Sequence, residues 1–151
     1  MSLATQIIDQ RVSGLVTQMA DILANELKLG ADEDKKRSAA FVSLVAKTVL
    51  NLTDEEAIEG IVDGGNDFGV DALFFTPPSD GEIRLTLIQG KYKRSLDGDS
   101  TFPENGIIKL IDAIGALFDP GKILTLNKRL RDRVEDIRSF VAEGPSRGSW
   151  R

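Results

Sequence analysis

Gly64-Gly65-Asn66-Asp67-Phe68-Gly69-Val70-Asp71-Ala72 is the stretch that decides the fold, and it leads into an apolar run over residues 70–75. The run is bounded by Gly69 before it and by turn-forming residues at 76–81. A β-branched and aromatic run between such residues predicts a largely buried strand. Asp71 would lie inside this strand, where a carboxylate is costly unless a cation or a set of donors compensates it. The sequence therefore predicts that something neutralises Asp71.

A second strand is predicted over residues 82–92, which include Ile88-Gln89-Gly90-Lys91-Tyr92. Side chains alternate between the two faces of a strand. One face would carry Leu85, Leu87, Gln89 and Lys91. Two prolines and Asp80-Gly81 separate the runs and favour a hairpin, which would bring Asp71 close to Gln89 and Lys91. This spacing of an acid, an amide and a lysine at strand ends is typical of metal-dependent nucleases.

These residues resemble the PD-(D/E)xK restriction-endonuclease-like superfamily, whose motif is an Asp on one strand and Glu-x-Lys or Gln-x-Lys on the next. Asp71 and Gln89-Gly90-Lys91 match the Gln form. The glycine-rich approach to Asp71 is similar to Mrr-type restriction enzymes and, more closely, to the amino-terminal domain of abortive-infection phage-resistance proteins. The resemblance covers roughly residues 37–118. It implies an α/β fold with a restriction-endonuclease-like core, in which helices flank a small central mixed β-sheet.

The resemblance also implies a function, which is metal-dependent hydrolysis of nucleic-acid phosphodiesters in prokaryotic phage defence by abortive infection. Asp71, the Gln89 side-chain oxygen and the Gly90 carbonyl would hold Mg²⁺ or Mn²⁺, because these hard cations take oxygen ligands. Asp67 would bind a second metal or cap the turn. Lys91 would orient or deprotonate the attacking water and stabilise charge on the phosphate. The implied catalytic residues are therefore Asp71, Gln89 and Lys91.

The chain departs from the superfamily pattern in one respect. Members usually add a Glu from the first core helix, often after a Phe, but Phe41 is followed by Val42 and no acid occurs between Ser38 and Asn51. The candidate substitutes for this acid are Glu26, Glu59, Asp63 and Asp67. Two alternatives follow. One is a catalytically inactive module of the same fold that binds nucleic acid or assembles into oligomers, and the other is a buried Asp71–Lys91 ion pair without chemistry.

Composition limits the classes of function. The 151 residues, 41% of them hydrophobic, predict one domain with a respectable core. The expected parts are an N-terminal helix at 1–30, a core at 31–118 and a C-terminal helix and tail at 119–151. Cysteine and histidine are absent, which excludes disulfides, thiolate ligands and imidazole chemistry. No apolar stretch approaches the roughly 20 residues that span a bilayer, and no signal peptide is evident, so a cytoplasmic protein without membrane contact is expected.

The charge is divided unevenly along the chain. Residues 1–80 carry 6 basic and 14 acidic side chains, a net −8, whereas residues 81–151 carry 13 and 10, a net +3. The basic half contains the proposed site, and Lys93 and Arg94 directly after it are expected to contact nucleic acid, with DNA favoured over RNA. A later basic cluster either contacts phosphates or forms a solvated helix face. It comprises Lys128, Arg129, Arg131, Arg133 and Arg138.

The remaining segments predict helices. An amphipathic helix is expected over 8–27, ending near Gly30, and another over 32–51 that buries Phe41, Leu44, Val45 and Leu50. Thr53-Asp54-Glu55-Glu56 predicts a capping box that opens a short helix. An apolar helix is expected over 107–118 and another helix over 124–142, with a loop at 95–105 that could close over substrate and a tail at 144–149. The resemblance implies a further strand after Phe118, and none is evident. The expectation is therefore either an amino-terminal fragment or a sheet completed differently, for example by a second subunit in a homodimer.

Overall fold

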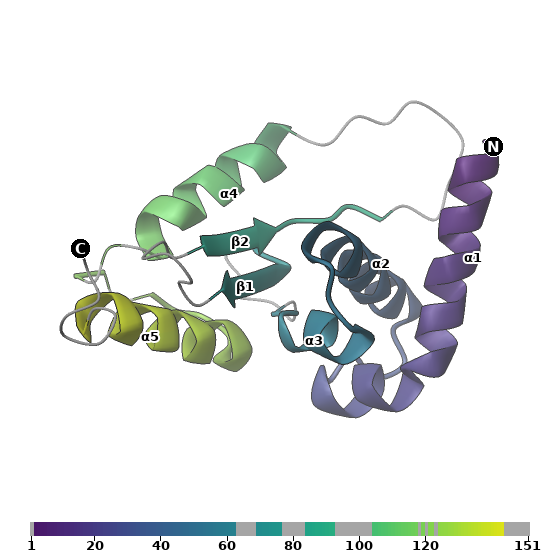
Figure 1. Ribbon diagram of the computed structural model, residues 1–151, viewed down its shortest axis with the longest axis horizontal. Coiled ribbons are helices and arrows are strands. Elements are labelled where there is room, and N and C mark those ends of the chain that lie inside the picture. Colours follow the sequence, from purple (N-terminus) through teal and green to yellow (C-terminus); the bar gives the residue numbers. More distant parts are fainter. Residues whose placement is uncertain are drawn as a thin grey trace.

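A computed structural model of the chain describes residues 2–62, 69–76, 84–92, 104–117, 119, 121–122 and 124–143, the last four by their backbone alone. The structure is mixed α/β and mostly helical (Figure 1). Its elements are α1 (Leu3–Gln18), the π-helix η1 (Ile22–Glu26), α2 (Glu33–Leu50), α3 (Asp54–Glu59), β1 (Ala72–Thr76), β2 (Arg84–Ile88), α4 (Glu104–Leu117) and α5 (Lys128–Glu143). No helix among the described residues is both long enough and apolar enough to cross a membrane.

Local signals set the ends of α2 and α3 as predicted. Asp32 caps α2, since its carboxylate accepts a hydrogen bond from the Lys35 N–H at 3.1 Å. Asn51 ends that helix in the left-handed conformation, with φ of 54°. Thr53 and Glu56 form the reciprocal capping box, with bonds of 3.2 and 2.8 Å. These helix boundaries are therefore confirmed.

The single long helix expected over 8–27 is wrong. Helix α1 ends at Gln18, and the chain continues through η1, where the Leu27 N–H bonds to the Ile22 carbonyl at 3.1 Å. A π-turn adds a residue to the helical turn and so rotates the residues that follow it. Met19, Leu23 and Leu27 all lie in the core.

Strands β1 and β2 form the predicted hairpin, which is the two-stranded antiparallel sheet of the described residues. Its register pairs Ala72 with Ile88 and Thr76 with Arg84. Both strands are shorter than predicted, so Asp71 lies just before β1 and Gln89 just after β2. The expected mixed sheet is not present among the described residues, because their strand pairing is antiparallel throughout. It consists of the β1–β2 ladder and an isolated bridge between Ile61 and Ala72.

The sheet is covered by helices on both faces, which creates two clusters of buried side chains. Ala72 and Phe74 point into a cluster with η1, α2 and α3, while Leu73 points into one with α4 and α5. The alternation is that of an ordinary strand buried on both sides. Figure 1 shows the same layering, with α2 and α3 on one side of the hairpin and α4 and α5 on the other. The hairpin ends that carry Asp71 and Gln89 are thus held by two separate cores.

The buried face of α2 differs from the prediction. The four large side chains expected to be buried, Phe41, Leu44, Val45 and Leu50, are only partly buried. The inward face consists of Ala39, Ala40, Val42, Ser43 and Ala46 instead. Val42 on this face lies against the segment after β2, where a Cβ added to Gly90 would come within 2.7 Å of Val42 Cγ2. Phe41, Leu44 and Val45 line a groove of about 480 Å³ together with Ile7 and Ile8 of α1, whereas Leu50 packs against the core.

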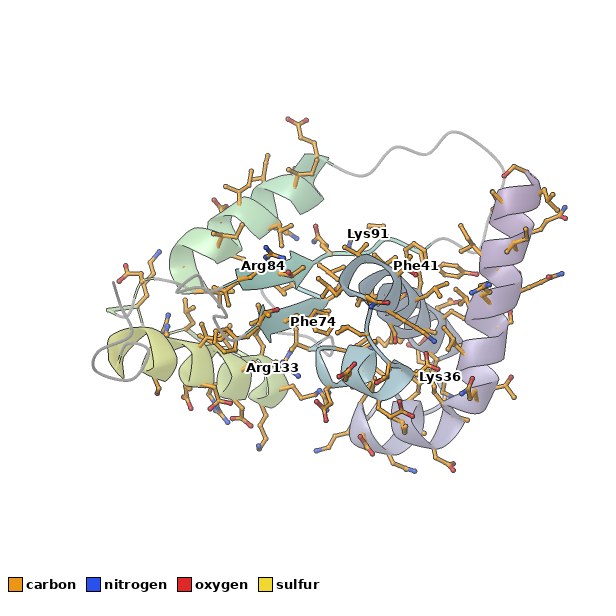
Figure 2. The ribbon with its side chains drawn as sticks, viewed as in Figure 1. Lys36, Phe41, Phe74, Arg84, Lys91 and Arg133 are labelled. Carbon is orange, nitrogen blue, oxygen red and sulfur yellow. The ribbon has the colours of Figure 1, made fainter. Side chains whose placement is uncertain are left out.

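Three arginines of α5 bond backbone carbonyls, so they form neither a phosphate cluster nor a simple solvated face. Arg138 caps the end of α4, bonding the carbonyls of Leu117 at 2.8 Å and Ala116 at 3.1 Å. Arg129 bonds the Ile61 carbonyl at 2.8 Å, and Arg133 bonds those of Leu73 and Glu59. Burial lowers the pKa of the Arg133 guanidinium. Figure 2 shows Arg133 at the junction of α5 with the rest of the fold.

Arg138→Ala is expected to lower the free energy of unfolding by about 2–3 kcal/mol, because charged donors to otherwise unpaired helix-end carbonyls are lost. Nucleic-acid affinity is expected to stay unchanged. Urea denaturation measures the first quantity and fluorescence anisotropy the second. Arg131→Ala on the same helix is the control, since that side chain is 52% exposed and its loss should change stability by no more than about 0.5 kcal/mol. Weaker nucleic-acid binding with unchanged stability in Arg138→Ala would mean that Arg138 contacts phosphates and does not stabilise the end of α4.

Candidate functional site

Asp71 is fixed at the entrance to β1 by its own backbone. Its N–H donates to the Ile88 carbonyl at 2.8 Å, and its carbonyl accepts from the Val62 N–H at 2.9 Å. The side-chain Oδ2 accepts a hydrogen bond of 2.6 Å from the Gly90 N–H. The hairpin thus brings Asp71 to the segment that contains Gln89 and Lys91, as the sequence predicted. The carboxylate is partly buried against that segment.

The side chain of Gln89 places a buried amide oxygen in this region. Its side-chain Oε1 is buried and has no hydrogen-bond partner among the residues that the structure describes. Its Nε2 lies close to Gly69, since a Cβ added there would sit 3.4 Å from that nitrogen and 3.2 Å from the Lys109 Cβ. Gly69 also has a φ of +77°, which favours glycine. The chain entering the site therefore passes tightly between Gln89 and Lys109 of α4.

Lys91 lies beyond the end of β2 and is exposed (Figure 2). Its ammonium makes no hydrogen bond or ion pair within the described residues. The buried Asp71–Lys91 ion pair, the structural alternative, is therefore not formed there. Gly90 places the segment against α2, because a Cβ on this residue would come within 2.7 Å of Val42 Cγ2. Lys91 is thus carried on a backbone that is tightly packed on one side.

Tyr92 anchors the other end of the same segment. Its hydroxyl donates to the Asp9 carboxylate of α1, and its ring contacts Phe41 with centroids 5.7 Å apart. The Arg37 guanidinium lies 5.9 Å from the ring centroid and bonds both Asp9 at 3.2 Å and Ser13 at 3.0 Å. Burial and the bond to Asp9 raise the pKa of Tyr92, while Arg37 opposes that rise. Residues 89–92 are therefore held at both ends.

Several predicted residues lie outside the described part of the chain. They are Asp63, Asp67, Lys93 and Arg94, together with residues 95–103 of the predicted loop and the tail at 144–149. Glu26 and Glu59, two proposed substitutes for the first-helix acid, instead line a cleft with Arg129 and Arg133. Within the described residues no group of three or more His, Cys, Asp or Glu side chains gathers to hold a metal ion.

Two oxygen-bearing side chains belong to this end of the hairpin: the Asp71 carboxylate, which accepts from the Gly90 N–H, and Gln89, whose Oε1 is buried without a partner among the described residues. The Gly90 carbonyl belongs to the same segment. All three are oxygen atoms, which suits a hard divalent cation that keeps several of its water ligands. Comparisons with known proteins identify no relative, because no family model, curated protein or solved structure matches the chain.

Three contributors to this region were not found from the sequence. Asp9 and Arg37 lie far from the motif in the chain, and no local pattern connects them to Tyr92, whose sequence context indicates packing or an interface. Lys109 lies on α4, where its backbone and Cβ approach Gly69. A single lysine on a largely apolar helix gives no signal of such a position.

Proposed function

We propose that the chain is a metal-dependent nuclease domain that hydrolyses phosphodiester bonds of nucleic acid, DNA in preference to RNA. The observation that carries the proposal is the buried Gln89 Oε1, which has no donor among the described residues and belongs to the segment whose Gly90 N–H binds Asp71. A buried polar atom without a partner costs about 1–3 kcal/mol. A divalent cation would compensate that oxygen and the Asp71 charge together.

Each residue has a distinct part in the proposed reaction. Asp71, the Gln89 oxygen and the Gly90 carbonyl hold Mg²⁺ or Mn²⁺, with Asp67 as an additional ligand. A bound ion of this kind lowers the pKa of water and polarises the phosphoryl oxygen. Lys91 orients the attacking water and stabilises charge on the phosphate, and its exposed ammonium, which has no partner among the described residues, supports this role. Lys93 and Arg94 contact the phosphate backbone.

The finer fold assignment is also a proposal. The match of Asp71 and Gln89-Gly90-Lys91 to the PD-(D/E)xK motif supports a restriction-endonuclease-like core. The antiparallel hairpin covered by helices on both faces is compatible with it. A role in phage defence by abortive infection rests on the resemblance of residues 37–118 alone. We infer it on that basis.

Gln89→Glu is expected to tighten Mn²⁺ binding by about tenfold or more, because ligand charge is a main determinant of cation affinity. The metal-free variant should melt at a lower temperature than the wild type, since it holds a second carboxylate in a partly buried site. Mn²⁺ should reverse this loss through preferential binding to the folded state. Isothermal titration calorimetry and thermal unfolding with and without Mn²⁺ measure both effects.

Gln89→Leu is the matched control, because it removes the unpartnered oxygen and keeps the approximate volume of the side chain. It should be at least as stable as the wild type without metal and should bind Mn²⁺ more weakly. Equal Mn²⁺ affinity in the wild type and Gln89→Leu would remove Gln89 from the site. Cleavage of plasmid DNA and single-stranded RNA with Mg²⁺ or Mn²⁺ then tests the activity itself, and a wild-type protein that binds no Mn²⁺ would overturn the proposal.

A second candidate function is a catalytically inactive module of the same fold that assembles into a homodimer. Within the described residues no three acidic side chains gather to hold a metal ion, and α4 exposes a row of large apolar side chains. They are Ile107, Ile108, Ile111 and Ile114. An apolar row of this kind is unusual on a monomer surface. Sedimentation equilibrium decides this point, since a monomer across the micromolar range would exclude the homodimer.

A further inference from the structure

Lys91 stands on a segment that the sheet does not hold. Strand β2 ends at Ile88, so residues 89–92 lie beyond the ladder that pairs the two strands. The described contacts that fix this segment are the Gly90 N–H bond to Asp71 on one side of Lys91 and the contacts of Tyr92 on the other. A catalytic side chain on such a segment is only as well placed as its two anchors.

The anchor at Tyr92 joins three elements. Its hydroxyl bonds Asp9 of α1, and Asp9 is in turn bonded to Arg37 of α2 at 3.2 Å. The side chains of Arg37 and Asp9 are 18% and 34% exposed, so solvent screens this ion pair less than a surface pair. Arg37 also bonds Ser13 of α1, which fixes the guanidinium over the Tyr92 ring.

We propose that Asp9, Arg37 and Tyr92 form a positioning network that holds the segment carrying Lys91 in the position required for reaction. Helix α1 therefore contributes to the site through Asp9. The inference rests on the proposed nuclease function. The Tyr92 hydroxyl is not needed to pack α1 on α2, because buried apolar side chains such as Val12 and Met19 lie on the N-terminal helices themselves. Its bond to Asp9 instead ties the residue next to Lys91 to α1. A displacement of about 1 Å near a reacting group can cost about 100-fold in rate.

A double-mutant cycle in the full chain tests the network. Tyr92→Phe removes only the hydroxyl and keeps the ring on Phe41, and Asp9→Ala removes the acceptor. Each change is expected to lower kcat by about tenfold, with KM and Mn²⁺ affinity within about twofold of the wild type. The double variant should be no slower than either single variant, since both remove the same bond. Asp9→Asn keeps an acceptor for the hydroxyl and should recover most of kcat.

Asp54→Ala is the matched control for the loss of a partly buried carboxylate. It removes the 2.8 Å bond to Lys47, between side chains that are 25% and 42% exposed, and has no contact with Tyr92. Its kcat should equal that of the wild type. If Asp54→Ala slows the reaction as much as Asp9→Ala does, the loss reflects general destabilisation and the positioning role is wrong.

Hydrogen exchange of the metal-free protein separates this inference from the proposed function. In both Tyr92→Phe and Asp9→Ala, the peptide covering residues 84–92 is expected to exchange about tenfold faster, while peptides from α5 remain unchanged. Faster exchange in a protein that cleaves neither DNA nor RNA would keep the positioning network and reject the nuclease. Unchanged exchange in both variants would overturn the network, whatever the cleavage rates. If Asp9→Ala does not fold, the exchange of Tyr92→Phe alone distinguishes these two outcomes.

Discussion

Lys91→Ala is expected to lower kcat for metal-dependent phosphodiester cleavage by about 10²–10⁴-fold, the usual contribution of a positioned acid–base group. The thermal midpoint and the Mn²⁺ affinity should not change. The physical reason is that the Lys91 ammonium is exposed and has no partner within the described residues, so the fold loses no bond when it is removed. Initial rates on plasmid DNA, with purified variants at saturating Mn²⁺, measure the effect.

Two further variants make this result specific. Lys122→Ala removes an exposed lysine from the connection between α4 and α5 and should cleave at the wild-type rate. Lys91→Arg keeps the positive charge but replaces a compact ammonium with a planar group that stays protonated. Compared with Lys91→Ala, it should restore DNA binding more fully than it restores kcat. Cleavage by Lys91→Ala within about threefold of the wild type would show that Lys91 neither activates water nor stabilises the phosphate.

Features with a local cause could be predicted from the sequence. The ends of α2 depend on Asp32 and Asn51, and the start of α3 on Thr53 and Glu56, all within one helical turn of the groups they bond. The β1–β2 hairpin has prolines and Asp80-Gly81 between two apolar runs. Its register alone brings Asp71 to the end of β2, so this part of the candidate site was also predictable.

Features with a distant cause could not be predicted. Large apolar residues indicated one face of α2, but the packed face is the one with Ala39 and Ala46. Val42 on that face lies so close to Gly90 that a Cβ there would come within 2.7 Å of it. Charge alone could not distinguish Arg138 at a phosphate from Arg138 at the carbonyl end of α4. Each outcome depends on which elements become neighbours in the fold.

The same reasoning separates the two halves of the candidate site. Asp71 and Gln89 come together through one hairpin, whereas Tyr92 and Asp9 are 83 positions apart in sequence. An aspartate in an N-terminal helix and a tyrosine after a strand have no spacing rule that relates them. The closeness of Asp71 to the Gln89 segment was therefore predictable, and the contacts that hold Tyr92 were not.

Asp71→Asn separates the charge of this side chain from its hydrogen bond. The Asn oxygen can still accept from the Gly90 N–H, so the fold should be retained, with the free energy of unfolding within about 1 kcal/mol of the wild type. The negative charge that would hold a divalent cation is lost. Asp71→Asn is therefore expected to cleave about 10³-fold more slowly or worse, because the bound cation would contribute several kcal/mol of charge stabilisation at the reacting phosphate.

Asp71→Ala provides the comparison, because it removes the acceptor as well as the charge and leaves the Gly90 N–H unpaired. It should be less stable than Asp71→Asn by about 1–2 kcal/mol while showing the same loss of cleavage and of Mn²⁺ binding. Chemical denaturation and calorimetric Mn²⁺ titration of the three proteins measure these quantities. Wild-type Mn²⁺ affinity and cleavage in Asp71→Asn would mean that the carboxylate serves only as the acceptor for Gly90. Asp71 and the Gln89 oxygen would then not bind a shared cation, and the proposed nuclease function would be rejected.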